Sequence, residues 1–468
     1  MTSVREFDLV VIGAGPAGTA AALRAGDLGA KTALITRGAF GGMSANDGPI
    51  PVRTLAHAAR LAREARQLSR YGIGVERPSL DYPRLLERAR EVVGEARRHS
   101  TLLEQITNAG VALFEHAGVA EFVDAHTIAS ASAPPLRGER IVICSGGVSR
   151  RLDIPGGELT VTPADAFSLK AVPKSMIVIG AGATGAQVAS IFNALGSSVT
   201  ICQAGPRIIA SEDSEVSDAV AAAFREDGIV IYQGFGAIEQ IERNGGGFRV
   251  SLAGVAEAPE AELVVCAVGW RADTDALNLR AAGVETNAHG FIEVDESLRT
   301  SAPHIYAAGD VLGRSMLVPA AVHDGFIAGN NAAGAEQLAV PADVEPIGSF
   351  TDPEYAKVGM TEEQARAQHD VLATHATYAE TTRPIIDGRT RGFCKLVVAR
   401  GTRRILGCHI VGERAVEVAQ MAAIAMTAEM TVDAVARIPL SFPTYANVFG
   451  RAALRAVRKL GYDVRPQA

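Results

Sequence analysis

Apolar runs that end in glycine-rich turns occur twice along the chain and predict two strand–turn–helix units. Residues 7–12 (FDLVVI) form a short β-branched run that ends at Gly13, after which small residues recur at helical spacing. Residues 175–179 (SMIVI) run in the same way into Gly180, and a helical pattern follows over residues 187–195. The order of strand, tight turn and helix is typical of a dinucleotide-binding fold.

Both turns carry the spacing Gly-x-Gly-x-x-Gly. Such a turn places the free N–H groups of a helix N-terminus against a pyrophosphate, and its glycines let the backbone approach closely. One copy is weak evidence because glycine turns after strands are common, but two copies between a strand and a helix predict two dinucleotide sites. The turns consist of Gly13, Gly15, Pro16, Ala17 and Gly18, and of Gly180, Gly182, Ala183, Thr184 and Gly185.

Other patterns predict the elements between and after these turns. Helices are expected at about residues 52–69 and 81–98, and four arginines lie on one side of the first: Arg60, Arg63, Arg66 and Arg70. We expect that side to be a solvated face rather than a ligand site. Strands at residues 141–144 and 263–268 are expected to be sheet edges that close on a nucleotide. A third region, from about residue 346, mixes strands (394–398, 405–411) with helices (415–430, 447–460).

Length and charge narrow the class of protein. The 468 residues predict about three domains, and 48% hydrophobic with 21% charged residues is an ordinary globular composition that excludes a disordered or collagen-like chain. A net charge of −7 argues against a nucleic-acid partner. The apolar stretch 176–196 contains Gln187, Ser190 and Asn193, so no integral membrane segment is expected. Without a signal-peptide pattern at the N-terminus, the sequence predicts a cytoplasmic protein.

The cysteines are few and scattered. Their spacing excludes a disulfide framework and a Cys-x-x-Cys metal or redox site, and no metal is expected. Two of them end predicted strands and are interpreted as small core residues. The five are Cys144, Cys202, Cys266, Cys394 and Cys408.

The order of the motifs resembles that of the flavoprotein disulfide reductases, the family of dihydrolipoamide dehydrogenase, glutathione reductase and mercuric reductase. The matching motifs are the two glycine turns, Gly41-Gly42, Ser145-Gly146-Gly147, Ala267-Val268-Gly269, Ala308-Gly309-Asp310, Thr351-Asp352-Pro353-Glu354 and Phe442-Pro443-Thr444. The resemblance implies an α/β fold with two Rossmann-like domains and a C-terminal α+β dimerisation domain. The implied domains are FAD-binding (1–155 and 276–345), NAD(P)H-binding (156–275) and dimerisation (346–468), in a homodimer whose active sites are completed by the partner subunit.

The resemblance also assigns cofactor contacts. It implies that the first turn holds the FAD pyrophosphate and that Asp310 bonds the sugar or phosphate region of the flavin. Further FAD contacts are expected from Thr36, Arg37, Gly41, Gly42, Met43, Ser145, Gly146 and Gly309. The second turn, with Gln203 and Gly269, would hold NADH or NADPH. Thr36 and Gln203 stand where an acid usually binds ribose, so both nucleotides stay open, with NADPH slightly favoured because Arg207 lies close by.

The thiol chemistry of the family is missing from this sequence. Ser44 and Pro49 stand where the family has its two redox cysteines, and neither can form a disulfide or a thiolate. Phe442 and Asn447 stand where the family has its histidine and glutamate pair, and neither titrates near neutrality. Disulfide reduction by the usual route is therefore excluded.

Neighbouring positions also differ from the family. Arg53 replaces the usual lysine and keeps a cation near the flavin, while Gln187 replaces its glutamate partner. Ala183 replaces a tyrosine that often covers the flavin, which would leave the nicotinamide side open; core packing explains a small residue there equally well. Tyr445 and Phe442 of the partner subunit would line an apolar acceptor pocket.

These observations predict an FAD-dependent NAD(P)H oxidoreductase that passes electrons directly to a small non-thiol acceptor such as a quinone. One alternative is a catalytically silent flavin-binding redox sensor or assembly protein. Another is an oxidoreductase for a dedicated metabolite, with Ser44, Asn46 and Asp47 in its pocket.

Overall fold

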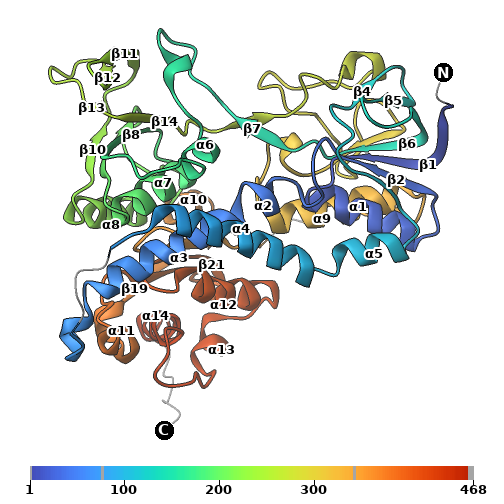
Figure 1. Ribbon diagram of the computed structural model, residues 1–468. Helices are drawn as coiled ribbons and strands as arrows, with labels where there is room; N and C mark the ends of the chain where they lie inside the picture. The colour runs from blue at the N-terminus through green and yellow to red at the C-terminus, as the bar shows by residue number, and fades with distance from the viewer. Residues whose placement is uncertain (1–2, 75–78, 341–343, 462–468) are drawn as a thin grey trace. The chain divides into compact units, whose positions relative to one another are not determined.

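The computed structural model describes residues 3–74, 79–340 and 344–461, and these fall into two units (Figure 1). The first unit contains Met1–Leu55, Pro83–Arg150 and Gly269–Ala342. The second unit contains Ala56–Tyr82, Arg151–Val268 and Asp343–Ala468. Each unit thus combines segments that lie far apart in the sequence.

A seven-stranded sheet forms the centre of the first unit. Its order is β3-β2-β1-β6-β5-β4, and β16 also pairs with β6. The pairs among β1, β2, β3, β6 and β16 are parallel, whereas the β4–β5 and β5–β6 pairs are antiparallel. The strands are β1 (Arg5–Ile12), β2 (Thr32–Ile35), β3 (Ala112–Phe114), β4 (Glu121–Phe122), β5 (Thr127–Ala129), β6 (Leu136–Ile143) and β16 (Ile305–Ala307).

The prediction that residues 141–144 form a sheet edge was wrong. Residues 141–143 of β6 pair with β1 on one side and with β16 on the other. Because β16 comes about 160 residues later in the sequence, local patterns could not reveal that it would cover this edge. β14 (Leu263–Cys266), in contrast, is an end strand of its sheet, as predicted.

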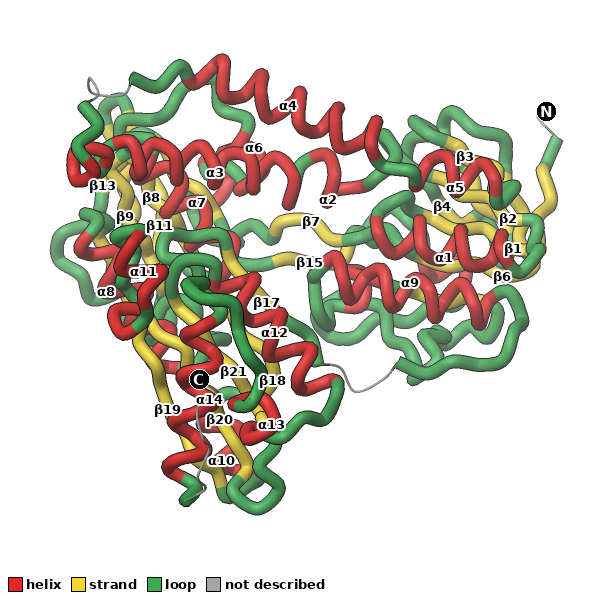
Figure 2. The backbone as a smooth tube through the Cα atoms, turned by 90° about the horizontal axis from the view of Figure 1, so that it is seen from below, coloured by secondary structure: helices red, strands yellow, loops and turns green. Residues whose placement is uncertain are grey.

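Two helices of the first unit, α1 (Pro16–Asp27) and α9 (Val318–Ala332), lie side by side against the sheet (Figure 2). Their contact is close because α9 carries glycines there: a Cβ on Gly325 would stand 2.1 Å from the carbonyl oxygen of Ala17. The other elements of the unit are α2 (Gly42–Asn46), most of α4 (Tyr82–His99), α5 (Leu102–Asn108), the short pair β7 (Gly147–Ser149) and β15 (Trp270–Ala272), and the 3-10 turns η3 (Leu279–Ala282) and η4 (Gly309–Leu312).

Residues 151–268 of the second unit contain a parallel sheet of order β10-β9-β8-β14. A small antiparallel sheet, β11-β12-β13, lies next to it in the chain. The elements are η2 (Gly157–Leu159), α6 (Pro163–Phe167), β8 (Ser175–Ile179), α7 (Ala183–Ala194), β9 (Ser198–Gln203), α8 (Ser214–Glu226), β10 (Val230–Gln233), β11 (Ile238–Asn244), β12 (Gly247–Leu252) and β13 (Glu260–Ala261).

The C-terminal part of the second unit is an antiparallel sheet of order β17-β18-β21-β20-β19. Its buried core is formed by the sheet with α12 and α14. The elements are β17 (Ile347–Ser349), β18 (Tyr355–Gly359), α10 (Glu362–Gln368), β19 (Val371–Thr377), η5 (Tyr378–Glu380), α11 (Thr382–Ile386), β20 (Phe393–Ala399), β21 (Ile405–Val411), α12 (Ala415–Thr427), α13 (Val432–Ala436) and α14 (Asn447–Lys459).

A buried lysine joins these two parts of the second unit. Lys395 on β20 is 2% exposed, and its ammonium lies 3.0 Å from Asp213 at the start of α8 and 2.7 Å from Glu362 on α10. Paired charges of this kind are costly to break because the remaining charge would stay buried.

Two predicted helices have limits in the structure that differ from those expected from the sequence. The helix expected from residue 52 begins earlier, as α3 (Pro49–Ala65), because proline fits the first turn of a helix. It also ends earlier and continues as the 3-10 turn η1 (Leu68–Tyr71). The helix expected to end at residue 430 ends at Thr427, and Glu429 has a left-handed φ of 51°.

The α/β class with Rossmann-like sheets and a separate C-terminal α+β part is confirmed. The last seven residues of the predicted third domain, 462–468, lie outside the described residues. Within the described ranges, no helix is long and apolar enough to cross a membrane, and no cluster of potential metal ligands occurs.

Candidate functional site

Five parallel strands of the first unit end at the same edge of the sheet, and the predicted FAD contacts follow these ends. β1 leads into the first glycine turn, β2 into Thr36, β6 into Ser145 and β16 into Asp310. β3 leads into Glu115, which the sequence analysis did not identify. Ligands of open α/β sheets bind outside the carboxyl ends of the strands, so these residues form one candidate site.

The first glycine turn is tightly packed against the neighbouring strand. Gly13 has a φ of +102°, and a Cβ there would lie 2.1 Å from the carbonyl oxygen of Cys144. A Cβ on Gly18 would lie 1.7 Å from the carbonyl oxygen of Gly13. Gly15 is the N-cap residue of α1 and provides no side-chain cap, while Pro16 and Ala17 form the first turn of the helix. The N–H groups of this turn are therefore left for an anionic ligand.

A second glycine pair closes on this turn from α2. The Gly41 N–H donates to the carbonyl of Ala14 at 2.9 Å. A Cβ on Gly42 would lie 2.6 Å from the Cα of Gly15, so only glycine permits this approach. Met43 and Ser44 follow in α2, and the Ser44 hydroxyl donates to the carbonyl of Gly41 at 3.1 Å. The predicted residues 41–44 and the first glycine turn are thus brought together.

Asp310 is the acidic group of this edge. Burial raises the pKa of its carboxyl group, and none of the described residues forms a hydrogen bond with its side chain. Ser145 has a buried hydroxyl without a partner in the described structure, Gly146 adopts a φ of +82°, and Gly309 one of +80°. A desolvated carboxylate beside a glycine turn fits a ligand that carries both hydroxyl and pyrophosphate groups, as FAD does.

The ribose position after β2 has no carboxylate of its own. Thr36 is 8% exposed, and Arg37 pairs with Asp273 at 2.8 Å. Glu115, at the end of β3, accepts a hydrogen bond from the N–H of Phe40 at 2.6 Å. The signal that could have found Glu115 is an acid directly after the apolar run 111–114, on a strand adjacent to Thr36.

The second glycine turn repeats this geometry in the second unit. A Cβ on Gly180, whose φ is +89°, would lie 2.5 Å from the carbonyl oxygen of Ala267, and one on Gly185 would lie 2.0 Å from the carbonyl oxygen of Gly180. Gly182 caps α7 without a side-chain bond, and Ala183 and Thr184 begin the helix. The turn is therefore a second anion site at a helix N-terminus.

Gln203 supports this turn from the end of β9. Its Oε1 accepts a hydrogen bond from the N–H of Ala181 at 2.9 Å. Arg207 directs its Nη2 to the carbonyls of Ala210 (3.3 Å) and Glu212 (3.5 Å) in its own loop. The preference for NADPH rested on Arg207, and this geometry gives it no support.

Three further predicted residues are divided between the two units. Gly269 has a φ of +108° where the chain passes from β14 to β15. Arg53 lies on α3 within the first unit, and Gln187 lies on α7 within the second, where its amide donates to the carbonyl of Ala183 at 3.2 Å. The expected pairing of Arg53 with Gln187 stays a prediction.

The expected thiol positions hold groups with structural roles. Pro49 begins α3, and Ser44 bonds within α2. All five cysteines are buried and none forms a disulfide within the described residues, and Cys144 lies beneath the first glycine turn, where burial raises its pKa. The interpretation of Cys144 and Cys266 as core residues is confirmed, since they are 6% and 1% exposed.

The C-terminal residues differ sharply in exposure. Phe442 is 74% exposed. Tyr445 donates its hydroxyl proton to Asp387 at 2.8 Å, and burial raises its pKa. Asn447 accepts from the N–H of Thr444 at 2.8 Å and so stabilises the turn before α14.

The prediction of a solvated face on α3 is confirmed for Arg66 and Arg70, which are exposed, and is wrong for Arg60 and Arg63, which are partly buried and paired. Arg63 is 13% exposed in its side chain and donates to the carbonyl of Ser190 at 2.7 Å. Arg66 donates to the carbonyl of Ala194 at 3.1 Å, and Arg60 pairs with Glu413. These partners lie more than 120 residues away, so the charge pattern of α3 alone could not reveal them.

Comparisons with known proteins agree with this geometry. Residues 7–325 match the family model described as pyridine nucleotide-disulphide oxidoreductase, and residues 346–453 match the dimerisation domain of the same family.

Similar proteins cover nearly the whole chain. A mercuric reductase of Lysinibacillus sphaericus is 33% identical over 96% of this chain and 82% of its own length. A dihydrolipoyl dehydrogenase of Chlorobaculum tepidum is 31% identical over 98% of this chain and 99% of its own. The solved structure of the HOCl-induced flavoprotein disulfide reductase RclA from Escherichia coli superposes with a TM-score of 0.85, at 26% identity over 95% of this chain and 99% of that one. The chain belongs to the pyridine nucleotide-disulphide oxidoreductase family, whose members use FAD and NAD(P)H.

Proposed function

We propose that the protein is a homodimeric NAD(P)H oxidoreductase that reduces a small non-thiol acceptor, with a quinone as the preferred class. NAD(P)H and one proton are consumed, two electrons and two protons reach the quinone, and NAD(P)⁺ and a hydroquinone are released. When bound, FAD supplies a centre that takes up a hydride and gives up one or two electrons. The domain limits expected from the sequence are part of this proposal.

The observation that carries the proposal is the environment of Ser44 and Pro49. Ser44 is bonded to the Gly41 carbonyl, and Pro49 starts a helix, so neither provides a thiol next to the first glycine turn. The five cysteines are all buried. A redox disulfide relay needs an accessible thiolate, and these positions supply none.

The second glycine turn, the proposed nicotinamide nucleotide site, has the features that hydride transfer to a flavin requires. The second glycine turn retains its geometry, and Ala183 at its end is exposed. A small side chain there leaves room for a nicotinamide, as direct transfer demands. We further propose that Arg53, with Gln187, places a positive charge near the flavin ring, which favours the reduced form.

On the acceptor side, Phe442 is the residue best suited to contact a flat aromatic molecule. Its ring is 74% exposed on the dimerisation domain, whereas the Tyr445 hydroxyl is already bonded to Asp387. We propose that Phe442 of the partner subunit covers the acceptor and that Tyr445 shapes the segment behind it. Asn447 keeps this segment in place through the Thr444 N–H.

An anaerobic visible spectrum of the FAD-loaded protein tests the proposal. NADH and NADPH are added separately, followed by a soluble quinone; glutathione disulfide and oxidised lipoamide serve as thiol-relay controls. We expect bleaching by at least one nucleotide, reoxidation by quinone and none by either disulfide. A spectrum that stays oxidised with both nucleotides would instead support the flavin-binding sensor.

A matched pair of variants tests the acceptor contact. Phe442→Ala removes the exposed ring and should raise the KM for quinone about tenfold without changing the rate of flavin bleaching by nucleotide. Ile438→Ala removes another exposed apolar side chain (45% exposed) of the same segment and should leave both unchanged. Equal effects of the two substitutions on the KM for quinone would show that Phe442 does not contact the acceptor.

A further inference from the structure

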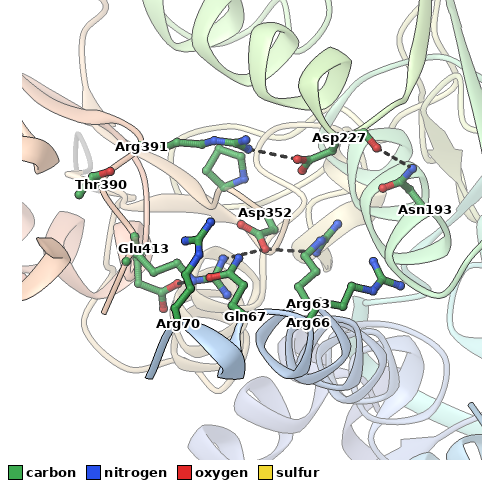
Figure 3. A pocket seen from close by; sticks show the side chains of 13 residues that line it. Arg63, Arg66, Gln67, Arg70, Asn193, Asp227, Asp352, Thr390, Arg391 and Glu413 are labelled. Carbon is green, nitrogen blue, oxygen red and sulfur yellow. Dashed lines mark hydrogen bonds and ion pairs between the residues drawn. The ribbon is translucent and has the colours of Figure 1, made fainter. Parts of the chain in front are cut away.

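A basic pocket of about 510 Å³ lies within the second unit and contains none of the residues assigned above to the nucleotide or acceptor sites (Figure 3). Three parts of the unit line it: the end of α3 with η1, the ends of α7 and α8, and loops of the C-terminal part. The lining residues that carry the argument are Arg63, Arg66, Arg70, Asp352, Arg389 and Glu413.

Cations outnumber anions in this lining. Five arginines face three carboxylates, which gives a net formal charge of +2. A single carboxylate, that of Asp352, is shared by Arg63 at 3.4 Å and Arg389 at 3.2 Å. Arg391 is paired with Asp227 at 3.1 Å and with Glu226, outside the lining, at 2.8 Å, so the excess positive charge of the pocket lies at Arg66 and Arg70.

Three guanidinium groups have capacity left for a ligand. Arg66 bonds only a backbone carbonyl, and Arg70 has no hydrogen bond or ion pair with any described residue. The Nη2 of Arg389, whose side chain is 15% exposed, is buried without a hydrogen-bond partner in the described structure; the carboxylate of Glu64 pairs with it only at 3.7 Å, beyond hydrogen-bond distance. A buried donor without an acceptor costs free energy, which a bound oxyanion would recover.

Part of the lining is shielded from solvent, since the side chains of Arg63 and Glu413 are 13% and 9% exposed. Burial lowers the pKa of Arg63, and burial raises the pKa of Glu413 even though cations surround it. Charge-assisted hydrogen bonds are strong where water is scarce.

We infer that this pocket binds a small multivalent oxyanion of the phosphate class, a pyrophosphate or a phosphorylated metabolite. Planar arginine forks match the paired oxygens of a phosphate group and bind them bidentately. A volume near 510 Å³ lies within the range of small-molecule sites and exceeds what a phosphate group alone would fill.

The position of the pocket couples it to the nicotinamide nucleotide. α7 begins at the second glycine turn with Ala183 and ends at Ala194, whose carbonyl bonds Arg66; Arg63 bonds Ser190 of the same helix. A ligand that forms hydrogen bonds with these arginines changes their contacts with α7 and thereby the affinity for the nucleotide. By linkage, the bound nucleotide must change the affinity for that ligand by the same factor. The same site would therefore act as an effector site for NAD(P)H binding.

Calorimetry on the full-length, FAD-loaded protein tests the site without turnover. The probes are inorganic pyrophosphate, orthophosphate and, as a non-phosphate polyanion, citrate. We expect one pyrophosphate site per chain, weaker orthophosphate binding and little citrate binding. Nucleotide titrations with and without pyrophosphate should differ in affinity, by a few-fold to tenfold.

Variants assign the binding to the pocket. Arg66→Ala with Arg70→Ala removes two of the available cations, both on exposed residues, and should weaken pyrophosphate binding at least tenfold. Arg66→Lys keeps the positive charge but loses the planar guanidinium group, and it should weaken pyrophosphate binding less than the double substitution does. Arg437→Ala, an exposed arginine of the same unit outside the pocket, is the matched control and should bind as wild type.

Three results would overturn parts of this inference. Absence of pyrophosphate binding, or binding that survives the double substitution, removes the site. Citrate binding as tight as pyrophosphate removes the phosphate preference. Tight pyrophosphate binding with unchanged nucleotide affinity removes the coupling through α7, whatever acceptor the enzyme reduces.

Discussion

The two glycine turns have the same spacing and nearly the same backbone, but their surroundings differ. The first is enclosed by α2, with Gly42 in contact with Gly15, and the partly buried carboxylate of Asp310 follows β16 at the same edge of the sheet. The second has one supporting side chain, the amide of Gln203, and its helix begins with the exposed Ala183. The glycine spacing therefore specifies a pyrophosphate site, whereas the neighbouring residues determine how firmly a dinucleotide is held.

This difference matches the two cofactors of the family. A site in which many protein groups contact the ligand retains that ligand through the reaction, as FAD requires. A site with few such groups lets its ligand leave in each cycle, as NAD(P)H must. Substitutions at equivalent positions of the two turns can test this interpretation.

The largest effects should come from an added methyl group at the first glycine of each turn. Gly13→Ala brings a Cβ to 2.1 Å from the Cys144 carbonyl, and Gly180→Ala brings one to 2.5 Å from the Ala267 carbonyl. Backbone must shift in both, at a cost of roughly 2–5 kcal/mol. We expect Gly13→Ala to be purified without flavin, and Gly180→Ala to retain FAD but lose NAD(P)H-dependent bleaching.

Each turn has a matched control close by in sequence. Gly29 follows α1 and Gly196 follows α7, with φ of +84° and +107° and no neighbour within 4 Å of an added Cβ. Alanine at either site strains the backbone, at a cost of about 1–2 kcal/mol, but introduces no clash. Cofactor binding should therefore stay intact. Loss of FAD from Gly29→Ala would show that strain, not the clash, explains the Gly13 variant.

Asp310→Ala should have the next largest effect, and only on the first site. Removing a charged acceptor of ligand hydroxyls costs about 1.5–3 kcal/mol, so FAD should bind about ten- to a hundredfold more weakly. Asp310→Asn keeps one hydrogen-bond acceptor, so its affinity for FAD should fall less than that of Asp310→Ala. The ratio of FAD to protein after dialysis measures both, and unchanged FAD content in Asp310→Ala would exclude Asp310 as a contact.

The same residue makes a prediction about pH for the FAD-free protein. Burial raises the pKa of Asp310 above its ordinary value of 3.8, so the folded chain binds more protons than the unfolded chain just above that pH. The contribution of Asp310 to the free energy of unfolding therefore falls as the pH rises through this window. Urea unfolding from pH 4 to 7 should therefore show that the free energy of unfolding of the wild type, relative to that of Asp310→Asn, falls as the pH rises.

Substitution of the middle glycine should separate ligand contact from protein packing. Gly15 and Gly182 have φ near −77° and −70°, and an added Cβ would meet nothing closer than 3.9 Å. The fold should accept alanine at both, so a loss of affinity, expected to be about tenfold, reports the approach of the pyrophosphate. Unchanged FAD binding in Gly15→Ala and unchanged NAD(P)H binding in Gly182→Ala would place the ligands elsewhere.

The parts of the molecule that the sequence could predict are those in which local pattern and structure coincide. The glycine turns and the strands before them follow from contacts within about ten residues, and β8 and β21 occur at the expected limits. The interior position of β6 depends on β16, and the role of Arg63 depends on Ser190, more than 120 residues away. Long-range pairings of this kind leave no periodic signal, so the basic pocket emerged only from the structure, whereas Glu115 had a local signal, an acid directly after an apolar run.

The smallest effect should come from Gln203, whose side-chain amide supports the second turn. Gln203→Ala leaves the Ala181 N–H without its partner, which costs about 1 kcal/mol and should raise the KM for NAD(P)H about fivefold. Gln203→Glu retains an acceptor for Ala181 and adds a carboxylate that binds ribose hydroxyls but repels a 2′-phosphate. It should therefore lower the KM for NADH and raise that for NADPH, while FAD content stays constant. Because Arg207 is directed to its own loop, no cation there should compensate for the added charge, and equal changes for both nucleotides would show that Gln203 supports the turn without contacting the ribose.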